Sequence, residues 1–217
     1  MINMTKSGAL GHGIVGLVIG PLVRGQTYKQ LAYLALSIPL AMVYWMVLGF
    51  GLIFGVILTI VLVGVVILLV TVLVTRPLVA FERWLANHLL AVDIGSANDL
   101  ETPPGKWGAV RRYLDASSTW RGLGFLSMKF WFAIIALVLL YGLYQAISMI
   151  STIVHRPLEI DFGEINGEPV VWSVETIGDV VIAVPVGIGL VIVVVHLING
   201  FGYIAARMSE ALLGEPR

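Results

Sequence analysis

The side chains that could carry catalysis or bind a metal are few in this sequence. The four histidines, His12, His88, His155 and His196, lie in separate segments with no His-x-x-x-His pair. There is no Gly-x-Ser-x-Gly motif and no Gly-x-x-x-x-Gly-Lys phosphate-binding loop. Cysteine is absent, which removes thiolate ligands and thiol redox chemistry. We therefore expect neither an enzyme nor a metal or cofactor site.

Two ionisable groups stand out because they lie in or beside long apolar stretches. Lys129 comes early in one such stretch and His196 late in another, each roughly 9 Å inside a membrane-spanning helix at 1.5 Å per residue. On neighbouring antiparallel helices the two side chains could meet, with a neutral histidine donating a hydrogen bond or with an anion such as a lipid phosphate between them. Alternatively, Lys129 extends to the membrane surface and His196 bonds a backbone carbonyl or a hydroxyl.

The helices that must position these groups follow from composition. Hydrophobic residues make up 59% of the 217 residues, charged residues 12%, and mean hydropathy is +0.97. Residues 30–75, 130–155 and 180–206 contain no Asp, Glu, Lys or Arg. Since a span needs about 20 apolar residues, the sequence predicts four transmembrane helices, two of them in the first stretch. We expect the first reversal at Gly49–Gly51, although Gly51-x-x-x-Gly55 is also typical of close helix packing.

The distribution of basic residues predicts the orientation. Residues 76–121 carry six Lys or Arg, whereas residues 151–179 carry only Arg156. The positive-inside rule places the first segment and both termini in the cytoplasm of a multi-pass plasma-membrane protein. In the outer segment, alternation over residues 158–163, the turn Asn166-Gly167 and residues 170–174 predict a small extracellular β-hairpin. A net charge of zero gives no indication of nucleic-acid binding.

Two stretches of sequence match at an offset of 92 residues, and they predict an internal repeat. Residues 27–34 and 119–126 each contain a Thr that could cap a helix, an aromatic residue and a basic residue, and Gln30 could complete a capping box. Each repeat is expected to end in a cytoplasmic interfacial amphipathic helix, over residues 76–90 and 202–214. The fold class is thus an all-α membrane protein of two parallel-related helix hairpins.

The predicted organisation has four parts. Residues 1–26 form a glycine-rich N-terminal interfacial segment, 27–93 the first repeat, 94–118 a cytoplasmic linker and 119–217 the second repeat. Five residues of the interfacial helices and linker are expected to face a partner: Arg83, Trp84, Arg111, Arg112 and Arg207. Tyr141, Tyr144 and Gln145, together with Tyr44 and Trp45, could line an outward pocket for a ligand or lipid headgroup, or form an aromatic belt.

Several of these motifs occur together in the order seen in one family. They are Thr27-Tyr28-Lys29-x-Leu31-x-Tyr33-Leu34, Pro39, Asp115-x-x-x-Thr119-Trp120-Arg121, Trp172-Ser173-Val174-Glu175-Thr176 and Ala211-Leu212-Leu213-Gly214. In this respect the chain resembles the Putative sensor domain family, whose members stand at the amino end of actinobacterial histidine kinases and alone in haloarchaeal membranes. The sequence after Gly214 does not resemble a kinase domain.

The resemblance implies a membrane sensor that passes its signal to a separate cytoplasmic or membrane protein. A small transporter or channel subunit is one alternative, and a structural subunit that oligomerises in a larger assembly is another. The absence of Asp and Glu from the expected spans argues against proton-coupled transport. The expected partners are the lipid bilayer, a signalling protein and further copies of the chain.

Overall fold

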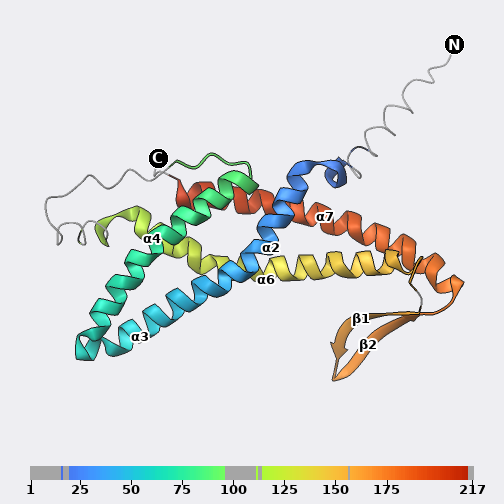
Figure 1. Ribbon diagram of the computed structural model, residues 1–217, viewed down its shortest axis with the longest axis horizontal. Coiled ribbons are helices and arrows are strands. Elements are labelled where there is room, and N and C mark those ends of the chain that lie inside the picture. The colour runs from blue at the N-terminus through green and yellow to red at the C-terminus, as the bar shows by residue number, and fades with distance from the viewer. Residues whose placement is uncertain (1–15, 17–19, 96–110, 112–113, 156, 215–217) are drawn as a thin grey trace, which may run out of the picture. The chain divides into compact units, whose positions relative to one another are not determined.

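The computed structural model of the protein describes residues 16, 20–95, 111, 114–155 and 157–214. Four helical stretches in this part of the chain are long and apolar enough to cross a membrane: Gly25–Val61, Val63–Leu89, Ser117–Ser151 and Ile177–Leu213. This confirms the predicted multi-pass membrane protein with four apolar helices (Figure 1). Most of the predicted N-terminal segment and linker, and Arg112, lie outside the described residues.

The chain divides into two compact units, each of which is described by itself. Unit 1 comprises residues 1–27 and 138–199, and unit 2 comprises residues 28–137 and 200–217. The helices α6 (Ser117–Ser151) and α7 (Ile177–Leu213) contribute residues to both units.

The first helical stretch does not reverse at Gly49–Gly51, so that prediction is wrong. The helix α2 (Gly25–Trp45) continues through a π-helical turn, Met46–Phe50, into α3 (Gly51–Ile57) and a 3₁₀ turn, Leu58–Val61. The chain reverses at Leu62, whose φ is 61°. Staying helical keeps every backbone group bonded, which an apolar environment requires.

The glycines of this stretch serve packing between helices. A Cβ atom at Gly51 would overlap the Thr71 side chain, and one at Gly55 would overlap the Leu68 side chain. Both partners lie on α4 (Val63–Leu89), so α3 and α4 approach more closely than larger residues would allow. The Gly51-x-x-x-Gly55 interpretation is therefore confirmed.

The helix α4 also differs from the prediction, because it continues without interruption to Leu89. Residues 76–89 are its C-terminal part and not a separate helix, and Pro77 does not end it. Similarly, α7 extends to Leu213 and includes most of the second predicted interfacial segment. That these helix ends lie in the membrane interface stays a prediction.

The predicted helix caps are not formed. The helices begin at Gly25 and Ser117, two residues before Thr27 and Thr119. The Thr27 hydroxyl donates to the carbonyl of Pro21 at 2.6 Å, and Thr119 accepts from Arg76 at 3.3 Å. Both threonines thus make contacts outside their own helices.

The hydrophobic core of unit 2 contains residues from four helices. Tyr33 and Tyr44 of α2, Leu85 of α4, Phe125 of α6 and Ala205 of α7 are all buried in it. Within this unit α4 and α6 run side by side in the same sense, because Arg76 contacts Thr119, and Glu82 contacts Lys129 further along both helices.

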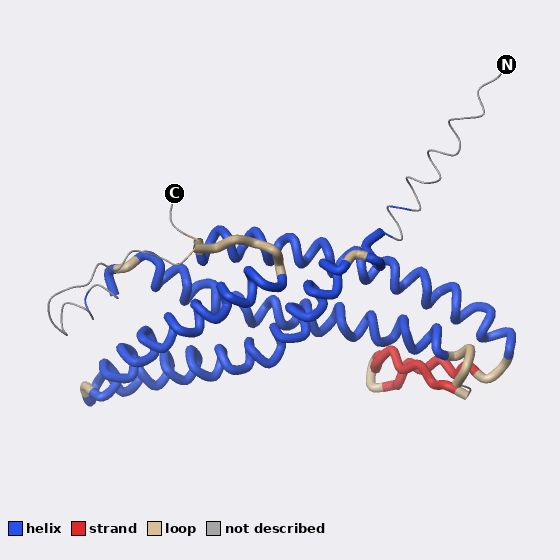
Figure 2. The backbone as a smooth tube through the Cα atoms, turned by 45° about the horizontal axis from the view of Figure 1, so that its top comes forward, coloured by secondary structure: helices blue, strands red, loops and turns tan. Residues whose placement is uncertain are grey.

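Unit 1 contains the predicted β-hairpin, made of β1 (Leu158–Ile165) and β2 (Glu168–Val174) (Figure 2). The strands are antiparallel, with Ile160 opposite Trp172. Asn166 and Gly167 have φ values of 56° and 85°, as a type I′ turn requires. Ile160 and Val174 are buried against Met149 and Ala183, so one face of the hairpin packs on α6 and α7.

Candidate functional site: a buried ion pair in the helix bundle

The most unusual feature of unit 2 is an ion pair that is completely buried. The ammonium group of Lys129 on α6 lies 2.8 Å from Oε2 of Glu82 on α4, and both side chains are 0% exposed. A charge in an apolar bundle is costly unless another charge and hydrogen bonds compensate it. Paired ionisable groups within spanning helices are therefore candidates for function.

Two tyrosines of α2 complete the hydrogen bonding of this pair. Tyr44 donates its hydroxyl hydrogen to Oε1 of Glu82 at 2.8 Å, so both carboxylate oxygens have a donor. Lys129 also donates to the Tyr33 hydroxyl at 2.8 Å, and its ammonium lies 4.0 Å from the centre of the Tyr33 ring. We call Tyr33, Tyr44, Glu82 and Lys129 the charge cluster.

The charge cluster joins three helices through side chains alone. A fourth helix, α7, places the buried Ser209 beside the Tyr33 hydroxyl. Since each member satisfies another, the cluster fixes how α2, α4 and α6 pack, and displacing one helix would leave buried charge uncompensated. The charge cluster therefore stabilises one relative position of these three helices.

Sequence reasoning found Lys129 but missed Glu82. Lys129 does not extend to the membrane surface, because its side chain is fully buried. Glu82 lies in the segment predicted as an interfacial helix, which the structure shows as the C-terminal part of α4, packed against α6. Two signals could have found it: it is the only acidic residue before Asp93, and it follows Thr75 and Val79 on one helical face.

The remaining ligand candidates are distributed between the two units. His196, in unit 1, is exposed, and its Nδ1 lies 2.8 Å from the carbonyl oxygen of Ile192 on the same helix. Tyr44 belongs to the charge cluster, while Trp45 is 59% exposed and stacks on Phe130 at 5.3 Å between ring centres. The partners of Lys129 are Glu82 and Tyr33.

In unit 1, Tyr141 and Gln145 hold the β-hairpin on α6. Tyr141 donates to the carbonyl oxygen of Asp161 at 2.9 Å, and the Gln145 amide donates to the same oxygen. Gln145 also donates to the Tyr141 hydroxyl at 3.2 Å. Tyr144 is 64% exposed. Two of the three residues therefore anchor the hairpin.

The residues expected to face a partner have varied surroundings. Trp84 is 54% exposed and stacks with Phe81 and His88. Arg111 forms an exposed ion pair with Asp115 at 3.7 Å, and Arg207 forms one with Glu210 at 3.3 Å. Arg83 is half-buried and donates to the carbonyl of Gly95 at 3.3 Å.

The family assignment covers the charge cluster and the hairpin together. Residues 33–213 match the family described as "Putative sensor", a range that begins at Tyr33 of the cluster and includes the whole hairpin. The chain belongs to this family. No curated protein and no solved structure is significantly similar to it. This family description supports a sensory role, and it names neither a ligand nor a partner protein.

Proposed function

We propose that the protein is a signal-input module of the plasma membrane, in which an external stimulus changes helix packing and a cytoplasmic protein partner detects the change. The charge cluster is the observation that carries this proposal. A switch needs an element with two arrangements separated by a few kcal/mol, and breaking a buried ion pair costs about 3–5 kcal/mol.

The proposed input is the β-hairpin. Tyr141 and Gln145 bond β1 to α6, and α6 is one uninterrupted helix that also carries Lys129. A ligand or a change in the lipids that displaces the hairpin would therefore move the helix that holds one partner of the ion pair. The basic residues of positions 76–121 support a cytoplasmic output and an external hairpin.

We further propose that the two helix hairpins are parallel copies of one unit. Two contacts between the copies each have a counterpart elsewhere in the chain. In each counterpart one residue is shifted by 92 positions and its partner by 123 positions. The contacts are Thr27–Asn199 and Gln30–Gly202, with the counterparts Thr119–Arg76 and Gly122–Val79. In each case the first helix of one copy contacts the second helix of the other copy.

Capture of the partner from native membranes tests the sensory role. Wild-type protein should retain a cytoplasmic protein under some growth conditions only. Glu82→Gln and Lys129→Met, which open the charge cluster, should make that capture independent of conditions. Tyr144→Phe is the control, since this exposed side chain lies outside the cluster. Capture that is constant in the wild type, or that ignores the cluster variants, would reject the proposal.

Ion-coupled transport is a second candidate, and Glu82 is the observation that favours it. The sequence predicts spans without acidic residues, and the structure places Glu82 on the long apolar helix Val63–Leu89, where it pairs with Lys129. Intramembrane ion pairs occur in proton and ion pathways. Purified protein in liposomes distinguishes the two functions: proton or ion flux that Lys129→Met abolishes would establish transport and refute a purely sensory role.

A further inference from the structure

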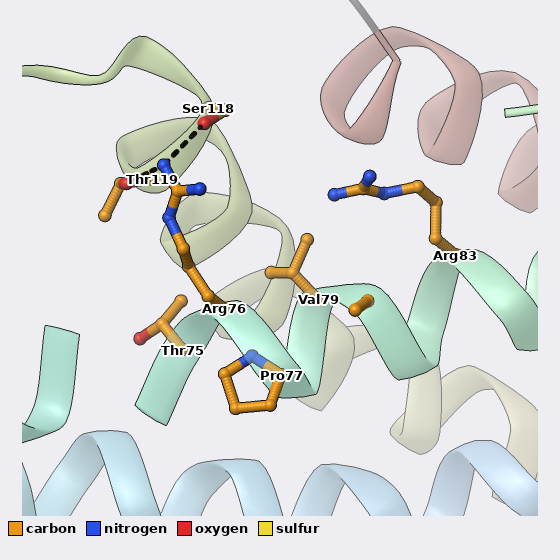
Figure 3. Close-up of a pocket in the computed structure, with 8 residues that line it drawn as sticks. Thr75, Arg76, Pro77, Val79, Arg83, Ser118 and Thr119 are labelled. Carbon is orange, nitrogen blue, oxygen red and sulfur yellow. Dashed lines mark hydrogen bonds between the residues drawn. The ribbon is translucent and has the colours of Figure 1, made fainter. Parts of the chain in front are cut away.

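The pockets of unit 2 differ in chemistry. The pocket in Figure 3 lies between α4 and the beginning of α6, and its lining includes Arg76, whose guanidinium donates to Ser118 and Thr119. Two other cavities, of about 210 and 190 Å³, lie between the first helical stretch, Gly25–Val61, and α6. None of the described residues that line these two cavities is charged. A ligand in them is therefore uncharged where it contacts the protein.

The two cavities form one groove between these helices. Both are lined by Trp45 and Phe130, whose rings stack with 5.3 Å between their centres. The linings lie within residues 44–53 and 126–130 for the first cavity, and within 38–45 and 130–137 for the second. Because the order is opposite on the two helical stretches, the cavities lie one on each side of the stacked pair. We call them together the α2–α6 groove.

The first cavity is open because residue 49 has no side chain. A Cβ atom at Gly49 would meet the Trp45 ring at 3.8 Å as its nearest neighbour, so space remains in front of this backbone. Glycine weakens a helix relative to alanine, and the close helix contact that explains Gly51 is not made by Gly49. Gly49 also lies in the π-helical turn Met46–Phe50, an irregularity that is frequent at functional sites. Both features indicate a binding cavity.

The hydroxyl groups in the first cavity already have acceptors. Tyr44 donates to Oε1 of Glu82 at 2.8 Å, and Ser127 donates to the carbonyl oxygen of Leu123 at 2.9 Å. Apart from the Trp45 indole, the other residues that line the two cavities are apolar. Dispersion contacts with the walls are therefore what would hold a ligand in the groove.

We propose that the α2–α6 groove binds one hydrocarbon chain of a bilayer lipid. Each cavity is smaller than typical ligand pockets, which start at roughly 300 Å³, and the two lie in series, which suits a slender chain. Residues 30–75 and 130–155 contain no Asp, Glu, Lys or Arg, so most of the groove lies where lipid chains are the surrounding medium. Met42 is 65% and Trp45 59% exposed, which leaves the groove accessible from that medium.

A chain in the first cavity contacts the charge cluster through Tyr44. The tyrosine lines this cavity, and its hydroxyl donates to Glu82. The bound lipid thus lies beside the residues that fix the packing of α2, α4 and α6. Lipid binding itself does not require the sensory role, so a failure to bind lipid and a failure to capture a protein partner are separate results.

Photolabelling of the full-length protein in phosphatidylcholine vesicles tests the proposal. A small fraction of the phosphatidylcholine carries a diazirine on one acyl chain, and mass spectrometry of peptides locates the adducts after irradiation. Adducts per exposed side chain should be about fivefold more frequent in the groove than around the exposed Ile188 and Val193 of α7, because a bound chain stays in contact longer than a passing one. Equal labelling of the two surfaces would overturn the proposal.

Matched variants show whether the cavities themselves are responsible. Gly49→Leu fills the first cavity and Ala133→Leu the second, so each should reduce labelling of its own cavity to the level of the α7 surface. Gly189→Leu is the control, because a side chain at this position of α7 enters open space and should leave labelling of the groove unchanged. Since the two filling variants lie on different helices, Ala133→Leu provides the test where Gly49→Leu lowers stability. Undiminished labelling in a filled cavity would contradict lipid binding there.

A second copy of the chain is the alternative occupant of the groove. The sequence contains no cysteine, so Met42→Cys introduces a single thiol at the second cavity. With a lipid chain in the groove, mild oxidation of this variant in membranes should leave the protein monomeric. A disulfide-linked dimer would place another copy of the chain against the groove, and lipid binding would be rejected.

Discussion

Removing one partner of the buried ion pair should destabilise the protein far more than removing both. Lys129→Met keeps an unbranched apolar side chain but leaves Glu82 in the bundle with Tyr44 as its remaining donor. Breaking a buried pair in this way costs about 3–5 kcal/mol. For a chain of this size that corresponds to a fall in Tm of roughly 10 °C. Glu82→Gln should cost a comparable amount, because it leaves the ammonium of Lys129 uncompensated.

The double variant provides the decisive comparison. With Lys129→Met and Glu82→Gln together no net charge is buried, and the amide oxygen introduced at position 82 can still accept from Tyr44. Stability should return to within about 1–2 kcal/mol of wild type, which gives a coupling energy of about 3 kcal/mol or more. Thermal unfolding in a mild detergent, followed by circular dichroism, measures all four proteins of this cycle.

Arg207→Gln is the matched control for this cycle. It removes an ion pair whose side chains are 66% and 42% exposed, so solvent screens the interaction and the melting temperature should change little. A coupling energy below about 0.5 kcal/mol between Lys129 and Glu82 would show that the two side chains do not interact, and the argument for the charge cluster would fail.

Two further predictions concern the helix packing and the hairpin. Gly51→Val should destabilise the protein by about 1–3 kcal/mol, because its side chain would overlap Thr71, whereas Gly49→Ala should be nearly neutral because its nearest neighbour is the Trp45 ring at 3.8 Å. Equal melting temperatures for the two variants would contradict the packing assignment. Tyr141→Phe combined with Gln145→Leu should release β1 and increase amide hydrogen exchange across residues 158–174, while Tyr144→Phe should not. Unchanged exchange in the double variant would show that these bonds do not hold the hairpin.

Sequence alone predicted the features that depend on composition and local conformation. Four apolar helices follow from uncharged stretches, and the hairpin turn follows from Asn166-Gly167, a pair that accepts positive φ at both positions. The prediction of a reversal at Gly49–Gly51 is wrong because glycine occurs both in turns and at close contacts between helices. The two roles can be distinguished only by the residues that face these glycines on α4, Thr71 and Leu68, which sequence alone does not identify.

The charge cluster could be predicted only in part, for a related reason. Lys129 stands out in the sequence because it lies within an apolar stretch, but identifying its partner depends on where α4 ends. Arg76-Pro77 is a common signal for the end of a span, and it predicts that Glu82 lies outside the bundle. The helix continues because its buried face, including Thr75 and Val79, extends past the proline to Glu82. Tertiary packing determined this boundary, and local sequence did not.

The buried ion pair also constrains how this protein can diverge. A lineage that replaces Lys129 or Glu82 alone passes through a form with an uncompensated charge inside the bundle, whereas replacing both restores a neutral core. Relatives should therefore fall into two groups, with both charges or with neither, and intermediates should be rare. The two positions are 47 residues apart in the chain. Their paired inheritance would be visible in an alignment without any structure at hand.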